Sequence, residues 1–134
     1  MLLFEWYRNK IKYTHEKKIL YFDNGRYEGD VKNGKMEGKG IAYFNNGEFK
    51  GDRYEGDWKN DKIEGKGIYY HNHGDRYKGD FKNDKREGKG IYYYNDGHRF
   101  EGYYKNDKQE GKGIYYYNDG RIENCYYLNG IEIK

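Results

Sequence analysis

The chain has 134 residues, the length of one domain of ordinary size, with no room for a second. Leu, Ile, Val and Phe make up less than a fifth of it, which is typical of disordered proteins, but 19 tyrosines provide rings that can be buried while their hydroxyls stay in water. With 26 Lys and Arg against 23 Asp and Glu, the charge is nearly balanced and does not point to a nucleic-acid or membrane partner.

Residues 1–26 contain degenerate copies of a motif that recurs later in the chain. The stretch ILYFDNG at 19–25 matches IAYFNNG at 41–47, and WYRN near the start is similar to YYKN at 103–106. The start MLLFEWYRNK has only a three-residue apolar run before charge appears, which is too short for a secretory signal or a membrane span. We therefore interpret residues 1–26 as the degenerate N-terminal cap of a repeat array within a single domain, 1–134.

Four clear repeats occupy residues 27–121. They begin at Tyr27, Tyr54, Tyr77 and Phe100, at spacings of 27, 23 and 23 residues, and the longer first step comes from four extra residues, Glu48 to Gly51. The eleven letters EGKGIYYYNDG occur twice, the second time 23 residues after the first. Such reuse predicts a stacked structural unit rather than an active site.

Each repeat is predicted to form a β-hairpin. From Tyr54 to Trp58, aromatic and small residues alternate with acids, which is the period of a strand. KNGK at 32–35 is a strong signal for a two-residue hairpin turn, and KNDK at 59, 82 and 105 is a weaker form of it.

A turn centred on Asn60 and Asp61 sets the expected register. It places three pairs opposite each other, with aromatic rings over glycines: Trp58 and Ile63, Gly56 and Gly65, Tyr54 and Gly67. On the other face it predicts three ion pairs: Glu28 with Lys39, Glu55 with Lys66, and Glu101 with Lys112. Two like-charge pairs do not fit, Lys78 with Lys89 and Asp57 with Glu64, so a shifted register stays open, and a shift of one residue would exchange the faces.

The aromatic and glycine columns are the predicted structural positions of the repeat. They are Tyr54, Gly56, Trp58, Gly65, Gly67, Tyr77, Gly79, Phe81, Gly88, Gly90, Phe100, Gly102, Tyr104, Gly111 and Gly113.

Residues 122–134 are predicted to be a C-terminal capping hairpin. The repeat frays here, and Ile122 to Cys125 stand where we expect the next Tyr-Glu-Gly-Asp, with Asn124 in place of glycine. YYLNGIEIK should form the last hairpin, with Leu128 against Ile131. Its open edge would invite strand pairing between copies.

The order Tyr-Glu-Gly-Asp-Trp, Lys-Asn, Glu-Gly-Lys-Gly-Ile-Tyr and Asn-x-Gly, at a spacing of 23, closely resembles the MORN repeat (membrane occupation and recognition nexus). The resemblance covers residues 27–120 and implies an all-β fold, an elongated single-layer antiparallel sheet of consecutive β-hairpins. The chain departs from the pattern at Val31 in the usual Trp place, at Phe100 for Tyr and at Tyr103 for Asp.

The sequence contains no convincing catalytic, cofactor-binding or metal-binding residues. Gly-Lys-Gly recurs inside strands with no helix following, unlike a phosphate loop. The acidic columns at Asp30, Asp57, Asp80 and at Glu37, Glu64, Glu87, Glu110 lack the order of a calcium loop. His71, His73 and His98 are expected to be loop residues, and Cys125 has no base partner. We predict a protein that is not an enzyme and needs no cofactor.

The tyrosine runs at 92–94 and 115–117 are the candidates for binding. Neighbouring rings of a strand point to opposite faces, so a single layer cannot bury all three. Some of the rings should cover glycines of the next hairpin. The others are predicted to form an exposed strip that receives a partner segment, made of Ile68, Tyr70, Ile91, Tyr93, Ile114 and Tyr116.

Three functions fit these features. The first is a scaffold that binds a protein partner or a second copy of itself, and the resemblance to MORN proteins, which organise cytoskeletal and membrane-contact assemblies, favours it. The second is binding to an anionic phospholipid surface, for which the sequence lacks a clustered basic patch. The third is an antitoxin-like or regulatory module for a cognate protein. No nucleic-acid partner is predicted, and the expected location is the cytoplasm, at a membrane or the cytoskeleton if the partner lies there.

Overall fold

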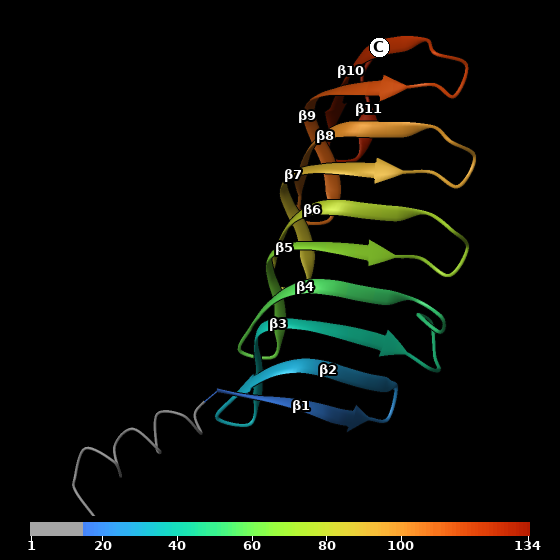
Figure 1. Cartoon of the computed structure of the whole chain (residues 1–134). Helices are drawn as coiled ribbons and strands as arrows, with labels where there is room; N and C mark the ends of the chain where they lie inside the picture. The colour runs from blue at the N-terminus through green and yellow to red at the C-terminus, as the bar shows by residue number, and fades with distance from the viewer. Residues whose placement is uncertain (1–14) are drawn as a thin grey trace, which may run out of the picture.

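The computed structural model describes residues 15–134. They form one antiparallel sheet of eleven strands whose spatial order is the order of the sequence (Figure 1). The strands are β1 (His15–Phe22), β2 (Gly25–Lys32), β3 (Lys35–Phe44), β4 (Arg53–Lys59), β5 (Lys62–Tyr70), β6 (Arg76–Lys82), β7 (Lys85–Tyr93), β8 (Arg99–Lys105), β9 (Lys108–Tyr116), β10 (Ile122–Leu128) and β11 (Ile131–Glu132). The predicted fold class, a single layer of consecutive hairpins, is confirmed. The stretch WYRN and the rest of the predicted cap before His15 lie outside the described residues.

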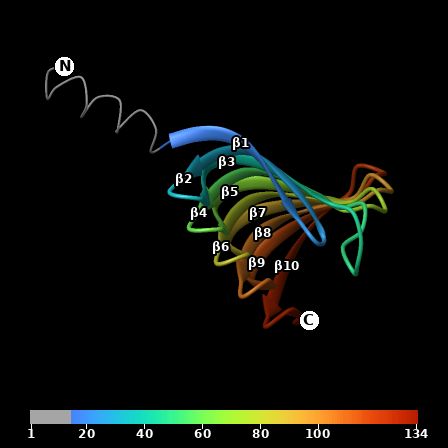
Figure 2. The same cartoon turned by 90° about the horizontal axis from the view of Figure 1, so that it is seen from below.

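The sheet is curved into a trough. Viewed along the stack, each strand bends, and the bends superpose from one hairpin to the next (Figure 2). One arm of the trough ends in the two-residue turns and is called the turn arm, and the other ends in the longer connections and is called the loop arm. The concave side is called the inner face and the convex side the outer face. Among the described residues, no helix is long and apolar enough to cross a membrane.

The turns lie where the sequence predicts them. In the β4–β5 turn, Asn60 and Asp61 both have positive φ, 48° and 67°. This is the geometry of a type I′ turn, whose twist matches that of paired strands. An aspartate is favoured at the second position of the turn because its carboxylate reaches the preceding hairpin, where Asp61 Oδ1 accepts the Met36 N–H at 2.9 Å.

The register differs from the predicted one by two residues beyond a bulge. Trp58 lies opposite Ile63 as predicted, but Gly56 lies opposite Gly67, and Tyr54 opposite Tyr69. The predicted pairs Gly56–Gly65 and Tyr54–Gly67 are therefore wrong. The cause lies in Gly65, which has a φ of 97°, and in Asp57, whose Oδ2 accepts the Lys66 N–H at 3.0 Å. Because side chains alternate between the two faces of a sheet, a register shift of two residues leaves every side chain on its predicted face.

The predicted ion pairs within hairpins are replaced by pairs between hairpins. Glu28, Glu55 and Glu101 lie opposite Ile41, Ile68 and Ile114. The lysines instead face the aspartates of the next hairpin, as Lys66 does with Asp80 at 2.8 Å and Lys39 with Asp57. Lys78 lies opposite Ile91, so the like-charge pair with Lys89 does not form.

The last hairpin also keeps the 23-residue step. Glu123 lies opposite Tyr115, as Tyr77 lies opposite Tyr69. The residues in the Tyr-Glu-Gly-Asp place are therefore Glu123 to Tyr126, and the predicted alignment from Ile122 was wrong by one residue. Cys125, not Asn124, replaces the glycine. Leu128 lies opposite Ile131 as predicted.

The core is a single line of rings on the inner face. Tyr27, Tyr54, Tyr77 and Phe100 are its fully buried large side chains. Tyr54 lies over Gly67, where a Cβ atom would overlap its ring, so the predicted stacking of rings on glycines is confirmed. Edge-to-face contacts link the rings in one chain: Tyr27, Trp58, Tyr54, Phe81, Tyr77, Tyr104, Phe100 and Tyr127.

Candidate functional site

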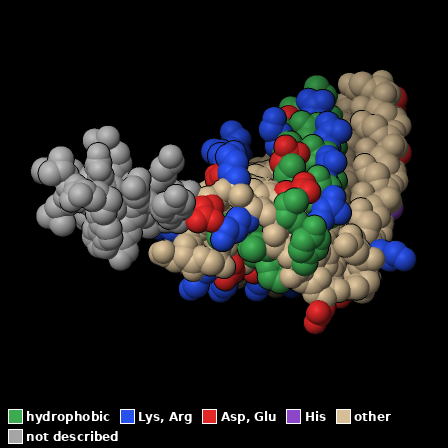
Figure 3. Space-filling model, turned by 60° about the horizontal axis from the view of Figure 1, so that its bottom comes forward, with side chains coloured by type: hydrophobic (Ala, Val, Ile, Leu, Met, Phe, Trp, Pro, Cys, Tyr) green, Lys and Arg blue, Asp and Glu red, His purple; other side chains and the backbone are tan. Residues whose placement is uncertain are grey.

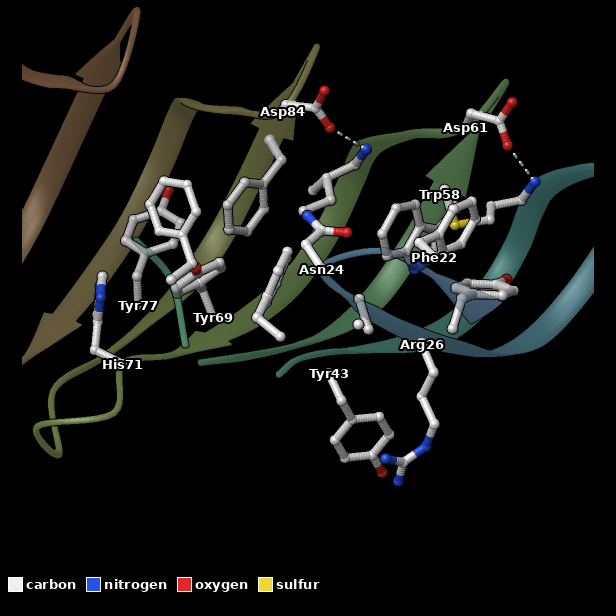
Figure 4. Close-up of a pocket in the computed structure, with 18 of the residues that line it drawn as sticks. Phe22, Asn24, Arg26, Tyr43, Trp58, Asp61, Tyr69, His71, Tyr77 and Asp84 are labelled. Atoms are coloured by element: carbon white, nitrogen blue, oxygen red, sulfur yellow. Dashed lines mark hydrogen bonds between the residues drawn. The ribbon is translucent and has the colours of Figure 1, made fainter. Parts of the chain in front are cut away.

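The inner face encloses a groove of about 550 Å³. Tyr27 and Tyr77 line its floor, Trp58, Ile63 and Phe81 its turn arm, and aromatic residues its loop arm (Figure 4). The groove runs from the first hairpin to the fourth. Because its walls are mainly apolar, it suits an apolar ligand.

Exposed aromatic rings form the loop-arm wall at the N-terminal end of the groove. Phe44 packs at 6.0 Å from Phe49 and at 6.3 Å from Tyr69 between ring centroids. Phe22 and Phe49 are each 49% exposed. Phe49 belongs to the four-residue insertion that lengthens the first repeat, so this insertion adds an aromatic side chain to the groove.

Arg86 places a cation in the aromatic groove. Its Nε donates to Asp107 Oδ1 at 2.7 Å, and its guanidinium lies 4.8 Å from the centroid of the Tyr104 ring. A stacked guanidinium gains a cation–π interaction with the ring. Sequence reasoning missed Arg86. The available signal is that this inner-face position changes type in every repeat, to Met36, Ile63, Arg86 and Gln109, while its neighbours recur.

Two buried aspartates fix the loops that border the groove. Asp52 Oδ2 accepts the Tyr69 hydroxyl at 2.7 Å, and its Oδ1 accepts the Asn72 N–H at 2.8 Å. Asp75 repeats this arrangement in the next hairpin with the Tyr92 hydroxyl at 2.8 Å. The order of the loop arm therefore depends on hydrogen bonds to buried carboxylates.

The histidines belong to these loops. His71 Nδ1 lies 4.0 Å from Asp52 Oδ2, and burial lowers the pKa of its imidazole, although the Asp52 carboxylate opposes that shift. His98 takes the place of the buried aspartate, and its Nδ1 accepts the Asn118 N–H at 2.9 Å. Among the described residues, no three His, Cys, Asp or Glu side chains come close enough to hold a metal ion.

The acidic columns have structural partners. Each glutamate of the column accepts the N–H of the asparagine in the next turn: Glu37 from Asn60, Glu64 from Asn83, Glu87 from Asn106 and Glu110 from Asn129. The glycines of Gly-Lys-Gly lie in the bulge and under the rings. Cys125 is half-buried, and burial raises the pKa of its thiol.

The six residues predicted to bind a partner all lie half-buried on the outer face, away from the groove. Tyr70, Tyr93 and Tyr116 are each covered by an arginine, with guanidinium-to-centroid distances of 4.1, 4.1 and 3.8 Å. Arg26 and Tyr43 form the same pair, pointing away from the groove in Figure 4.

Charged residues also separate the isoleucines of this set. Ile68 lies between Glu55 and Lys78 of the adjacent strands. Figure 3 shows a band in which hydrophobic, basic and acidic side chains alternate. The structure thus brings the six residues to one face but mixes them with charges. Their role in binding stays a prediction.

Lysines flank the turns in pairs on the outer face of the turn arm. The pairs are Lys32 and Lys35, Lys59 and Lys62, Lys82 and Lys85, and Lys105 and Lys108. All eight are exposed. No carboxylate of the described residues forms an ion pair with any of them. The structure therefore has a double row of lysines that sequence reasoning missed.

Comparison with protein families identifies the repeat. The family model of the MORN repeat matches residues 27–51, 54–76, 77–99 and 100–120. A comparison with curated proteins finds no match. MORN repeats are a non-catalytic repeat type, generally found in proteins with binding or scaffold roles.

Proposed function

The chain belongs to the MORN-repeat family, and from this premise we propose that it is a non-catalytic scaffold whose inner groove holds an apolar segment of a partner protein. The observation that carries the proposal is the groove of about 550 Å³, with half-exposed aromatic rings at its N-terminal end. Apolar surface that a protein leaves exposed in a concave site is typical of a binding surface.

The partner segment that fits best is amphipathic. Apolar side chains would lie on the floor of the groove, where Tyr27 and Tyr77 are buried and expose no polar group. Asp61 and Asp84 lie at the turn-arm wall, and each binds a backbone N–H through Oδ1. The Oδ2 of each accepts no bond from the residues that the structure describes, so it could accept one from a basic residue of the partner. A segment with an apolar face and basic residues along one edge would therefore satisfy both surfaces.

Peptide display on the whole chain tests this proposal. Selected peptides should bind the wild-type chain, and Phe22→Asp with Phe49→Asp should weaken them at least tenfold, which is about 1.4 kcal/mol. Both rings are half-exposed, so the double variant should fold.

The matched control is Tyr70→Thr with Tyr93→Thr on the outer face. This variant should bind as tightly as the wild-type chain. If it loses the peptides while the groove variant keeps them, the groove proposal fails, and the outer-face strip predicted from the sequence becomes the binding surface.

The double row of lysines supports anionic phospholipid as a second candidate. Basic residues near an anionic surface contribute about 1 kcal/mol each, and eight of them lie on one arm. Co-sedimentation with phosphoinositide vesicles tests it. Binding that persists at about 0.15 M salt, where the screening length is roughly 8 Å, and that is lost in Lys82→Ser with Lys85→Ser would support this candidate. Binding at low salt alone would argue against it.

A chain that regulates a cognate protein would bind it through the same groove, so this role is part of the first proposal. We propose that the chain is located in the cytoplasm.

A further inference from the structure

The outer face of the last hairpin is apolar at five positions where the third hairpin is charged, and at a sixth Lys78 is replaced by the polar Asn124. The observed register aligns residues 122–133 with residues 76–87. The exchanged positions are Arg76 to Ile122, Asp80 to Tyr126, Lys82 to Leu128, Lys85 to Ile131 and Glu87 to Ile133. The same trend begins one hairpin earlier, where Tyr103 replaces the repeat's aspartate.

Six exposed apolar side chains form what we call the terminal apolar patch. They are Tyr103, Ile122, Tyr126, Leu128, Ile131 and Ile133, which are exposed by 53, 66, 49, 56, 72 and 48%. None of them takes part in the stacking of the hairpins. The stack is held by inner-face rings, including Tyr127, which packs 5.4 Å from Phe100. The patch can therefore be exchanged without touching the core.

An exposed apolar face is the opposite of what a terminal repeat needs in water. Terminal units of a repeat array keep a polar outer face for solubility. Six large side chains of roughly 200 Å² each, about half exposed, offer on the order of 600 Å² per copy, close to the roughly 800 Å² that each partner buries in a standard interface. This area is sufficient for a stable contact.

We propose that the terminal apolar patch binds a second copy of this chain, with the two last hairpins related by a twofold axis. In such a contact the same surface meets itself, so apolar side chains face apolar side chains.

The strand edge beside the patch favours the same partner. β11 pairs with Tyr127 and Leu128 of β10, so within residues 15–134 the half of β10 that starts at Ile122 pairs with a strand on the β9 side alone. This half contains neither proline nor lysine, which natural edge strands use against pairing between chains, and Glu123 is its single charged residue. The contact is separate from the groove, and a failure of the groove proposal would leave it unaffected.

Analytical ultracentrifugation of the full chain over a range of concentrations tests the proposal. The wild-type chain should approach twice the 16.2 kDa mass of one copy. The variant with Ile122→Arg, Tyr126→Asp, Leu128→Lys and Ile131→Lys should stay at one copy, with its dissociation constant raised at least 100-fold. Each substitution introduces the residue that the third hairpin has at the equivalent position, so the circular dichroism spectrum of the variant should be unchanged.

The control variant removes exposed apolar residues from the other end of the sheet, with Ile19→Thr and Tyr21→Thr, and should dimerise like the wild-type chain.

As a second measurement, Ile131→Cys in a Cys125→Ser background should be joined between copies by a short bismaleimide, and Tyr21→Cys in that background should not. A wild-type chain that stays monomeric at all concentrations overturns the proposal. So does a monomer whose binding to anionic vesicles is lost in the fourfold variant, since the patch would then contact a membrane.

Discussion

Tyr54 shows how a single residue decides the geometry of the stack. Its ring covers Gly67, and its hydroxyl donates to the Asp57 carbonyl oxygen at 2.9 Å. One side chain therefore stabilises both the packing of the ring on the glycine and the backbone of the bulge. Phe100 lacks the hydroxyl, and in its hairpin Tyr103 pairs directly with Glu110. The bulge thus moves where the tyrosine and the aspartate are both missing.

Gly67→Ala should destabilise the protein by about 2 kcal/mol, because overpacking a tight core typically costs about 1–3 kcal/mol. The added Cβ would overlap the Tyr54 ring. Urea denaturation measures the loss. In a Tyr54→Ala background the same change should cost much less, since the ring is gone. Equal costs in the two backgrounds would contradict the packing argument.

The buried tyrosines also predict loss of stability at alkaline pH. Burial, helped by the Asp30 carboxylate, raises the pKa of Tyr27 to about 12. The unfolded chain releases this proton near pH 10, while the folded chain keeps it. Unfolding therefore releases protons between about pH 10 and about pH 12, and the free energy of unfolding falls through that window.

Denaturation midpoints measured from neutral pH upward should drop above about pH 10. Tyr27→Phe should start about 1 kcal/mol lower at neutral pH, because it loses the hydrogen bond to the Asp30 carbonyl oxygen, and should then fall less steeply. Identical slopes for the two proteins would show that Tyr27 does not contribute.

At the level of the hairpin, turn chemistry was predictable and register was not. Asn-Asp between lysines marks a two-residue turn wherever it occurs, and the pair Trp58–Ile63 beside it is as predicted. The bulge that follows depends on Asp57 reaching across the strands and on Gly65, and a run of Glu-Gly-Lys-Gly has no local signal that separates a bulge from a plain strand. Everything beyond it was therefore displaced by two residues.

Asp61 allows a test of how one hairpin holds the next. Asp61→Asn keeps an acceptor for the Met36 N–H and should change the free energy of unfolding by no more than about 0.5 kcal/mol. Asp61→Ala loses the acceptor and puts a methyl side chain at positive φ, so it should cost about 2 kcal/mol. Thermal and urea denaturation check the order. Equal stabilities of the two variants would show that the bond between the hairpins contributes little.

For the whole molecule, the sequence predicts a stack but not its groove. Period and glycine columns indicate hairpins side by side. The register of the turn pairs Phe81 with Arg86, but the curvature that turns their wall toward the loop arm depends on the bulges. The sequence does not reveal that arginines cover the tyrosines of the predicted outer-face strip, because these arginines lie on neighbouring strands, 17 residues away in the case of Tyr70 and Arg53.

A stack in which each hairpin contacts its neighbours alone should tolerate the loss of one whole unit. Removing residues 79–101, one 23-residue step, joins Lys78 to Gly102 and leaves every inner-face ring on the inner face. The shortened chain should fold, with a urea m-value reduced in proportion to the lost surface. Removing residues 79–100 leaves one extra residue in the strand, which turns Tyr104 to the outer face, and that chain should lose its cooperative transition. If both deletions fold equally well, the alternation of faces does not control the fold.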